Sequence, residues 1–141
     1  MKIKDIRIDS PGSAISESDI SDLESNVGFA LPSDYCQFLR KHNGGQPMPY
    51  SVEIVDFDQS PTDVQVFFGI NRIENTSNIS WNLAELSERL NGVGLPIACD
   101  SGGALFVLKS NESVVYLLPF EDDSTMYFVA DSFSEFVNML S

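Results

Sequence analysis

The segment from Leu31 to Gly45 constrains the fold of this chain more than any other, because clear start and stop signals enclose a short amphipathic run. Pro32 suits the first position of a helix, where its missing N–H would have no partner, and Asp34 complements the positive end of the helix dipole. Helical spacing places three large apolar side chains on one face: Tyr35, Phe38 and Leu39. The basic run Arg40-Lys41-His42 suits the last turn, and Asn43-Gly44-Gly45 ends the helix. We therefore predict a helix from Pro32 to His42 with one buried face.

Three more helices are indicated by capping and by apolar spacing. Two capping-box patterns, in which each side chain can satisfy an exposed backbone N–H, are Ser16 with Asp19 and Ser132 with Glu135. The first of these helices ends at Gly28, which accepts the left-handed backbone conformation. Apolar residues at spacings of four, three and four predict another helix, which ends at Asn91-Gly92: Ile79, Leu83, Leu86 and Leu90.

Short β-rich runs occupy the rest of the chain. We predict a strand from Ile3 to Ile8 and two adjacent strands from Tyr50 to Phe57 and from Asp63 to Ile70. The later runs predict a meander: Leu95 to Cys99 with Ala104 to Lys109, Val114 to Leu118, and Thr125 to Ala130. This order predicts a single α+β domain over residues 1–141, with a largely antiparallel sheet of about five to six strands and about four flanking helices.

Charge narrows the class of partner. The chain has 21 acidic and 8 basic residues, a net charge of -13, and residues 42–141 hold fourteen of the acids with three bases. Such a field repels nucleic acid and anionic membrane surfaces, so we expect neither as a partner. A basic protein is the natural complement, and the alternative is that the acidity serves solubility alone.

Other sequence features bear on the cellular compartment. We find no apolar run long enough for a membrane helix, and residues 1–7 lack the apolar core of a signal peptide. Cys36 and Cys99 form neither a disulfide framework nor a metal-binding spacing. We therefore expect a cytoplasmic protein.

We expect no catalytic residue, cofactor or metal ligand. His42 is the one histidine, and no Gly-x-Ser-x-Gly motif accompanies it. The acidic run from Asp56 to Asp63 is similar to a calcium loop, but Pro61 and Phe67 stand where that loop requires Gly and Glu. No Lys-Ser/Thr pair follows Gly102-Gly103, so this pair predicts a tight turn and not a phosphate site.

Partner contact has three candidate sites. Two are acidic: the loop with Asp56, Asp58 and Asp63, and the run Glu121, Asp122 and Asp123. The third is Trp81, which lies about 200° round its helix from Ile79, away from the leucine stripe. We favour burial of Trp81 against a second part of the core, and an exposed binding anchor is the alternative.

The run from Leu31 to Leu39, followed by Asn43-Gly44-Gly45, resembles the signature of the SUKH superfamily, which includes the yeast cell-wall-synthesis regulator family and many bacterial immunity proteins. The run from Leu95 to Gly103 is similar to the second block of that family, and Phe133 to Phe136 is similar to its closing helix. The resemblance covers essentially the whole chain. Its motif is carried over as a set of fold-defining positions: Leu31, Pro32, Tyr35, Phe38, Asn43, Gly44 and Gly45.

The resemblance implies an α+β domain without enzymatic activity that binds a cognate polymorphic toxin, often a nuclease. Nucleases that hold phosphate backbones have basic surfaces, so an acidic inhibitor would be steered onto them. The alternative is a cytosolic regulatory scaffold or interaction module that binds an endogenous protein, and an enzyme ranks third. The oligomeric state stays open.

Overall fold

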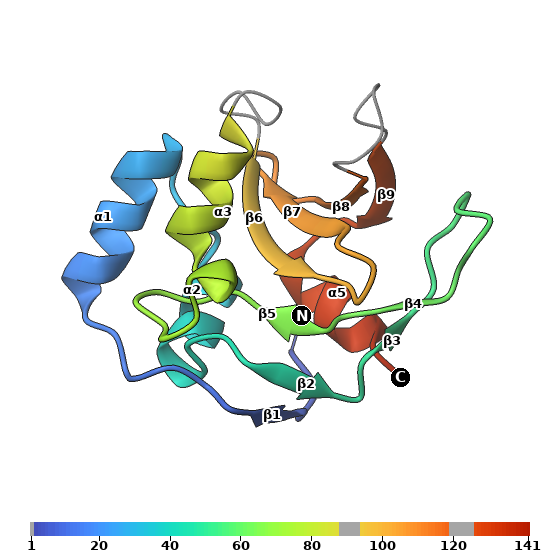
Figure 1. Ribbon diagram of the computed structural model, residues 1–141, viewed down its shortest axis with the longest axis horizontal. Coiled ribbons are helices and arrows are strands. Elements are labelled where there is room, and N and C mark those ends of the chain that lie inside the picture. Colours follow the sequence, from blue (N-terminus) through green and yellow to red (C-terminus); the bar gives the residue numbers. More distant parts are fainter. Residues whose placement is uncertain (1, 88–93, 119–125) are drawn as a thin grey trace.

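A five-stranded antiparallel sheet forms the centre of the fold in a computed structural model that describes residues 2–87, 94–118 and 126–141 (Figure 1). The strands lie side by side in chain order: β5 (Val66–Phe67), β6 (Gly94–Cys99), β7 (Leu105–Lys109), β8 (Val114–Leu117) and β9 (Met126–Ala130). From β6 to β9 each strand pairs antiparallel with the next, so the predicted meander and the α+β class are confirmed. The middle strands are buried on both faces, which explains their nearly continuous apolar sequence.

The β-rich runs nearer the N-terminus pair differently from the prediction. Two small antiparallel sheets form: β1 (Arg7–Asp9) with β2 (Gln46–Met48), and β3 (Ser51–Val52) with β4 (Thr62–Asp63). The predicted strand from Ile3 to Ile8 is therefore too early, and β2 was missed because Pro47 weakens a strand pattern. The prediction of two adjacent strands from Tyr50 to Phe57 and from Asp63 to Ile70 holds only for β3 and β4. The rest of the second run leaves its neighbour, because Gln65 N–H donates to the carbonyl of Cys99 and β5 then pairs with β6.

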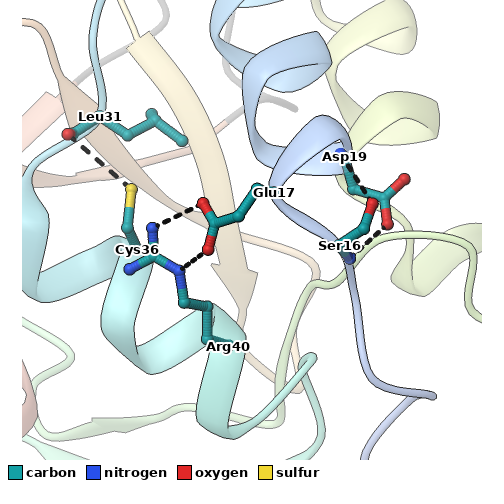
Figure 2. Close-up of polar contacts among 6 residues, drawn as sticks. All are labelled: Ser16, Glu17, Asp19, Leu31, Cys36 and Arg40. Carbon is teal, nitrogen blue, oxygen red and sulfur yellow. Dashed lines mark hydrogen bonds and ion pairs between the residues drawn. The ribbon is translucent and has the colours of Figure 1, made fainter.

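The helices form close to the predicted residues: α1 (Glu17–Val27), α2 (Ser33–Lys41), α3 (Ile79–Glu85) and α5 (Phe133–Met139), with a 3₁₀ turn η1 (Asn75–Ser77) before α3. The predicted capping box is confirmed: Ser16 Oγ accepts from the N–H of Asp19 at 3.2 Å, and Asp19 Oδ2 accepts from the N–H of Ser16 at 2.8 Å (Figure 2). At α5, Ser132 makes one half of the pattern and accepts from the N–H of Glu135.

Helix ends differ slightly from the predicted ones. α2 is one residue shorter at each end, because Pro32 and His42 have extended backbones and act as its caps. The predicted last turn at Leu90 and its stop at Asn91-Gly92 lie outside the described residues. Within the described ranges, no helix is both long enough and apolar enough to cross a membrane.

Helices α1 and α2 are joined by a two-pronged ion pair. Arg40 Nε and Nη2 donate to Glu17 Oε1 and Oε2 at 2.7 and 3.0 Å (Figure 2). Both side chains face solvent, so this pair adds little stability and weakens with salt. A local contact holds the start of α2 to the residues that precede it: Cys36 Sγ donates to the carbonyl of Leu31 at 3.9 Å (Figure 2).

Aromatic rings fill the space between the main sheet and the helices α2 and α5. The ring of Phe133 on α5 lies 4.9 Å from that of Tyr35 and 5.0 Å from that of Phe38, both on α2. The ring of Phe67, from β5, lies 5.0 Å from that of Phe38. Edge-to-face and tilted pairs of this kind add about 0.5–1.5 kcal/mol each beyond their buried area. These rings hold α2 and α5 against the sheet.

Asn43, directly after α2, connects three separate parts of the chain. Its Nδ2 donates to the carbonyls of Ser13 and Ile70 at 2.9 and 2.7 Å, and its Oδ1 accepts from the N–H of Ile70 at 2.7 Å. Its own carbonyl accepts from Gly12 N–H at 2.9 Å and from Arg72 Nη1 at 3.0 Å. The side chain is buried, with 3% of its surface exposed. We call these contacts the Asn43 network.

Two glycines after Asn43 let other chain segments approach closely. Gly44 has φ +76°, and a Cβ there would lie 2.7 Å from the carbonyl oxygen of Phe67. Gly45 has φ +127°, and a Cβ there would lie 2.5 Å from the side chain of Ile8. A side chain at either position would separate the elements that meet here. The structure buries all seven motif positions: Leu31, Pro32, Tyr35, Phe38, Asn43, Gly44 and Gly45.

Replacement of Asn43 by alanine tests the network. The variant Asn43→Ala removes three partly buried hydrogen bonds to backbone groups of Ser13 and Ile70. Each such bond contributes about 0.5–1.5 kcal/mol, so we expect the free energy of unfolding in urea to fall by about 1.5–4 kcal/mol. The control Asn26→Ala, at an exposed position of α1, is expected to change it by less than about 0.5 kcal/mol. Equal unfolding free energies for the two variants would contradict this role.

A second prediction concerns Tyr35, whose side chain is 1% exposed and whose hydroxyl has no hydrogen-bond partner among the described residues. Burial raises the pKa of this hydroxyl, so it remains neutral. Since an unsatisfied buried hydroxyl is unfavourable, we expect Tyr35→Phe to keep the contact with Phe133 and to raise the free energy of unfolding by about 0–1 kcal/mol. Urea denaturation measures this change, and a loss above about 1 kcal/mol would show that the hydroxyl has a partner in solution.

Candidate functional site

A cleft of about 640 Å³ opens between the hairpin formed by β3 and β4 and the turn that joins β6 to β7. The hairpin contributes aromatic and apolar walls, the turn contributes small polar residues, and β8 contributes the floor. Figure 1 shows the hairpin extending from the body of the molecule near this turn. We call the cleft the acidic groove and define it by seven of its lining residues: Tyr50, Phe57, Pro61, Asp63, Asp100, Ser101 and Tyr116.

Asp100 lies at the floor of the acidic groove, 5% exposed, and its carboxylate accepts four hydrogen bonds. Oδ1 accepts from the N–H groups of Gly102 and Ala104 at 3.0 and 2.9 Å. Oδ2 accepts from Thr62 Oγ1 at 2.8 Å and from the hydroxyl of Tyr116. A carboxylate has about four acceptor positions, so Asp100 is fully used in joining the hairpin, the turn and β8. Burial of the Tyr116 hydroxyl, together with its hydrogen bond to Asp100, raises the pKa of that hydroxyl.

Asp63 in β4 is held differently. Its Oδ1 accepts from the N–H of Ser101 at 2.9 Å, and its Oδ2 accepts from the hydroxyl of Ser101. Each oxygen therefore has one bond from Ser101 and a second acceptor position left over. The side chain is partly exposed and lines the groove. Asp63 is thus fixed in orientation and able to bind another donor.

Phe57 fixes the loop of the hairpin over the sheet. Its ring lies 5.0 Å from that of Tyr116 and 5.2 Å from that of Tyr127. Asp56 and Asp58, on either side of Phe57, are exposed and do not line the groove itself. The structure therefore separates the acidic residues of the predicted loop: Asp63 lies in the groove, and the other two lie on the adjacent loop surface.

Trp81 on α3 corrects one expectation. Its side chain is 40% exposed, so the favoured burial of Trp81 is wrong. Helix α3 packs beside β6 with Ile79 in the core. Trp81 lies on the opposite side of this short helix and therefore faces solvent. Trp81 does not line the acidic groove. Its role as a binding anchor stays a prediction.

Other candidate residues differ in outcome. Glu121, Asp122 and Asp123 lie outside the described residues. Tyr50, which is 50% exposed, and Asp100 are groove residues that sequence reasoning did not select for partner contact. The run from Asp100 to Gly103 did signal a turn, but no local pattern indicates that this turn faces a hairpin.

A second cleft of about 320 Å³ adjoins the acidic groove and shares Tyr50 and Asp63 with it. It extends past Met48 and Asp9. Among the described residues, no lysine, arginine or histidine lines either cleft. Asp9 is paired with Arg7 at 3.1 Å, so the negative field comes from Asp63 and Asp100 of the acidic groove, and it favours a cationic ligand.

Basic side chains gather at a different cleft, of about 280 Å³, lined by Lys2, Lys4 and Lys41. The same cleft is also lined by His42, Asp34 and Ser134. These three residue types are those of a hydrolytic triad. However, the hydroxyl of Ser134 donates to Asp34 Oδ2 at 2.7 Å, and so does its N–H at 2.9 Å. Burial and the charge of Lys41 lower the pKa of His42. The bond from serine to aspartate ties α5 to α2 and leaves no nucleophile hydrogen-bonded to histidine in this part of the structure.

The described residues contain no group of three or more histidine, cysteine, aspartate or glutamate side chains that could hold a metal ion. Asp63 and Asp100 share the groove, but serine, threonine, tyrosine and backbone donors surround their oxygens. The arrangement is suited to binding a cationic group.

Cys99, beside Asp100 in the chain, provides a test of the negative field. Burial, together with the charges of Asp100 and Asp63, raises the pKa of its thiol to about 11. Since the thiolate is the reactive form, we expect iodoacetamide to alkylate Cys99 at pH 8 at least about tenfold more slowly in the native protein than in urea. Mass spectrometry distinguishes this site from Cys36.

Two variants separate the field from burial. Asp63→Asn removes one negative charge and is expected to lower the thiol pKa and speed native alkylation, whereas Asp22→Asn on exposed α1 is not. Identical native rates in both variants would show that Asp63 does not act on the thiol.

A model of the SMI1 / KNR4 family (SUKH-1) matches residues 14–139, which include the acidic groove and, from the Asn43 network, Asn43, Ile70 and Arg72. The chain is also similar to a protein of Bacillus subtilis (strain 168) described as SPbeta prophage-derived uncharacterized protein YokK, with 26% identity over 155 aligned positions. That match covers 96% of this chain and 81% of the Bacillus protein. The chain therefore belongs to the SMI1 / KNR4 family (SUKH-1).

Proposed function

We propose that this protein is a non-enzymatic bacterial immunity protein, acting in the cytoplasm, that binds and neutralises a cognate toxin with a basic surface. The observation that carries the proposal is the acidic groove, which has two carboxylates, aromatic walls and no basic residue among its described lining. Membership of the SMI1 / KNR4 family (SUKH-1) supports it, because the SUKH superfamily includes many bacterial immunity proteins. The net charge of -13 supports a basic partner.

The groove and the hairpin loop perform different steps in this proposal. Exposed Asp56 and Asp58 extend the negative field into solvent and speed the approach of a basic surface. Asp63 and the aromatic walls of the groove then make the close contacts that slow dissociation. A toxin that uses its basic surface to hold nucleic acid would lose access to its substrate while this surface is covered.

A regulatory scaffold for an endogenous protein is the second candidate. It is favoured by the superfamily that the chain resembles, because that superfamily also includes the yeast cell-wall-synthesis regulator family. The same acidic groove would then bind a basic segment of a cellular partner. The neighbouring coding sequence separates the two candidates, because an immunity protein is expected immediately downstream of a toxin with a basic C-terminal domain.

Binding to that neighbouring toxin domain tests the proposal. We expect the purified protein to bind it, to block its toxicity on co-expression, and to bind more weakly as salt concentration rises. In stopped-flow mixing, the double variant Asp56→Lys/Asp58→Lys should associate about tenfold more slowly. Asp56 has φ +71°, which Lys adopts less readily than Asp, so the melting temperature is compared with that of a control that also changes a positive-φ residue, Glu112 at φ +75°.

The matched control is Asp22→Lys/Glu112→Lys, which makes the same change in net charge on α1 and on the β7–β8 turn, at the end of the sheet away from the groove. Equal slowing in both double variants would show that net charge acts and that the loop has no specific role. No binding to the toxin domain would favour the scaffold.

A further inference from the structure

We propose that the acidic groove is an arginine-binding pocket, which takes the guanidinium group of a basic partner protein between Asp63 and the ring of Tyr50. The identity of the partner rests on the proposed function. The chemistry of the pocket does not, because it follows from the acceptors, rings and charges that line the groove.

The free acceptor positions of Asp63 match a guanidinium group. Ser101 binds both carboxylate oxygens, at 2.9 Å from its N–H and through its hydroxyl, and so prevents the carboxylate from rotating. One acceptor position remains on each oxygen. An N–H group of arginine can donate to one of these positions while the planar guanidinium stays free to stack on a ring, whereas an ammonium group presents a compact, strongly hydrated charge.

The ring of Tyr50 supplies a second contact. It is 50% exposed, and it lines both the acidic groove and the adjoining cleft together with Asp63. A planar guanidinium stacks on an aromatic face and is attracted by its quadrupole, which contributes about 0.5–2 kcal/mol depending on exposure. Phe57 and Pro61 offer apolar surface for the methylene stem of the side chain.

The charge of Asp100 favours a cation without offering it a bond. Its four acceptor positions are used by protein donors, so it acts on a ligand only through its field. No described basic residue lines the groove to neutralise this buried charge. A guanidinium group at Asp63 would bring the missing positive charge to the cleft.

The dimensions of the groove agree with this use. A cleft of about 640 Å³ falls in the range of ordinary ligand pockets, which is about 300–1,000 Å³. It can hold one long side chain together with water. Binding of a partner through one arginine in a desolvated pocket is a common form of interface anchor.

The test uses the folded protein and small probes, so it does not depend on a toxin. ¹⁵N-labelled protein is titrated with N-acetyl-arginine-methylamide, with the matching lysine compound, and with the matching citrulline compound, which has the shape of arginine without its charge. We expect arginine to shift the amide signals of Ser101 and Gly102 with a Kd of about 1–10 mM, at least about fivefold tighter than lysine. Citrulline should produce no saturable shift.

Three variants locate the contact. Asp63→Asn keeps an acceptor for the N–H of Ser101 and is expected to weaken arginine binding at least about tenfold. Tyr50→Ala should weaken it about threefold or more, and Tyr50→Phe should leave it unchanged because the ring face is kept. Asp22→Asn on exposed α1 is the charge control and should not alter it. Melting temperatures confirm that each variant is folded.

Several outcomes would overturn the inference. Equal affinities for arginine and lysine would mean that the groove responds to charge alone. Shifts at α1 or α3 with none at Ser101 would place the cation elsewhere. Arginine binding together with failure of toxin binding would reject the proposed partner and keep the pocket, whereas toxin binding that Asp63→Asn and Tyr50→Ala do not weaken would reject the pocket and keep the partner.

Discussion

The Asn43 network is the interaction on which the arrangement of the elements depends. The side chain of Asn43 binds the segment before α1 and the loop after β5 in one place, and Gly45 exchanges backbone hydrogen bonds with Phe67 directly afterwards. β2 begins at the next residue and pairs with β1, so the path of the chain toward the hairpin is set here. The acidic groove therefore takes its position from a buried amide that lies outside it.

The carboxylates near the groove differ in what they can do, although they look alike in the sequence. Asp100 is buried and saturated with hydrogen bonds, so its role is to join segments. Asp63 is oriented by Ser101 and keeps free acceptor positions. Asp56 and Asp58 are exposed, and in the proposed function they act through their field. The net charge of -13 thus combines residues that join segments with residues that are proposed to bind a partner.

Structural features that depend on residues close together in the chain could be predicted from the sequence. Features that depend on contacts between distant segments could not. The capping box at Ser16 and the meander depend on neighbours in the chain, and both were predicted. The pairing of β5 with β6, the exposure of Trp81 and the position of Tyr50 beside Asp63 depend on tertiary contacts. Of the three acidic residues of the predicted loop, only Asp63 lines the groove, where Ser101 binds its carboxylate.

The attachment of the hairpin has a consequence for how this family can diversify. Its loop is held to the sheet by the buried side chain of Ile54 and by the ring of Phe57, while its base is fixed by Asp100 and Ser101. The segment between Phe57 and β4 can change in length and charge without altering the aromatic core or the Asn43 network. A lineage that acquires a new partner could therefore exchange this loop and retain the core, so recognition and stability would evolve at separate rates.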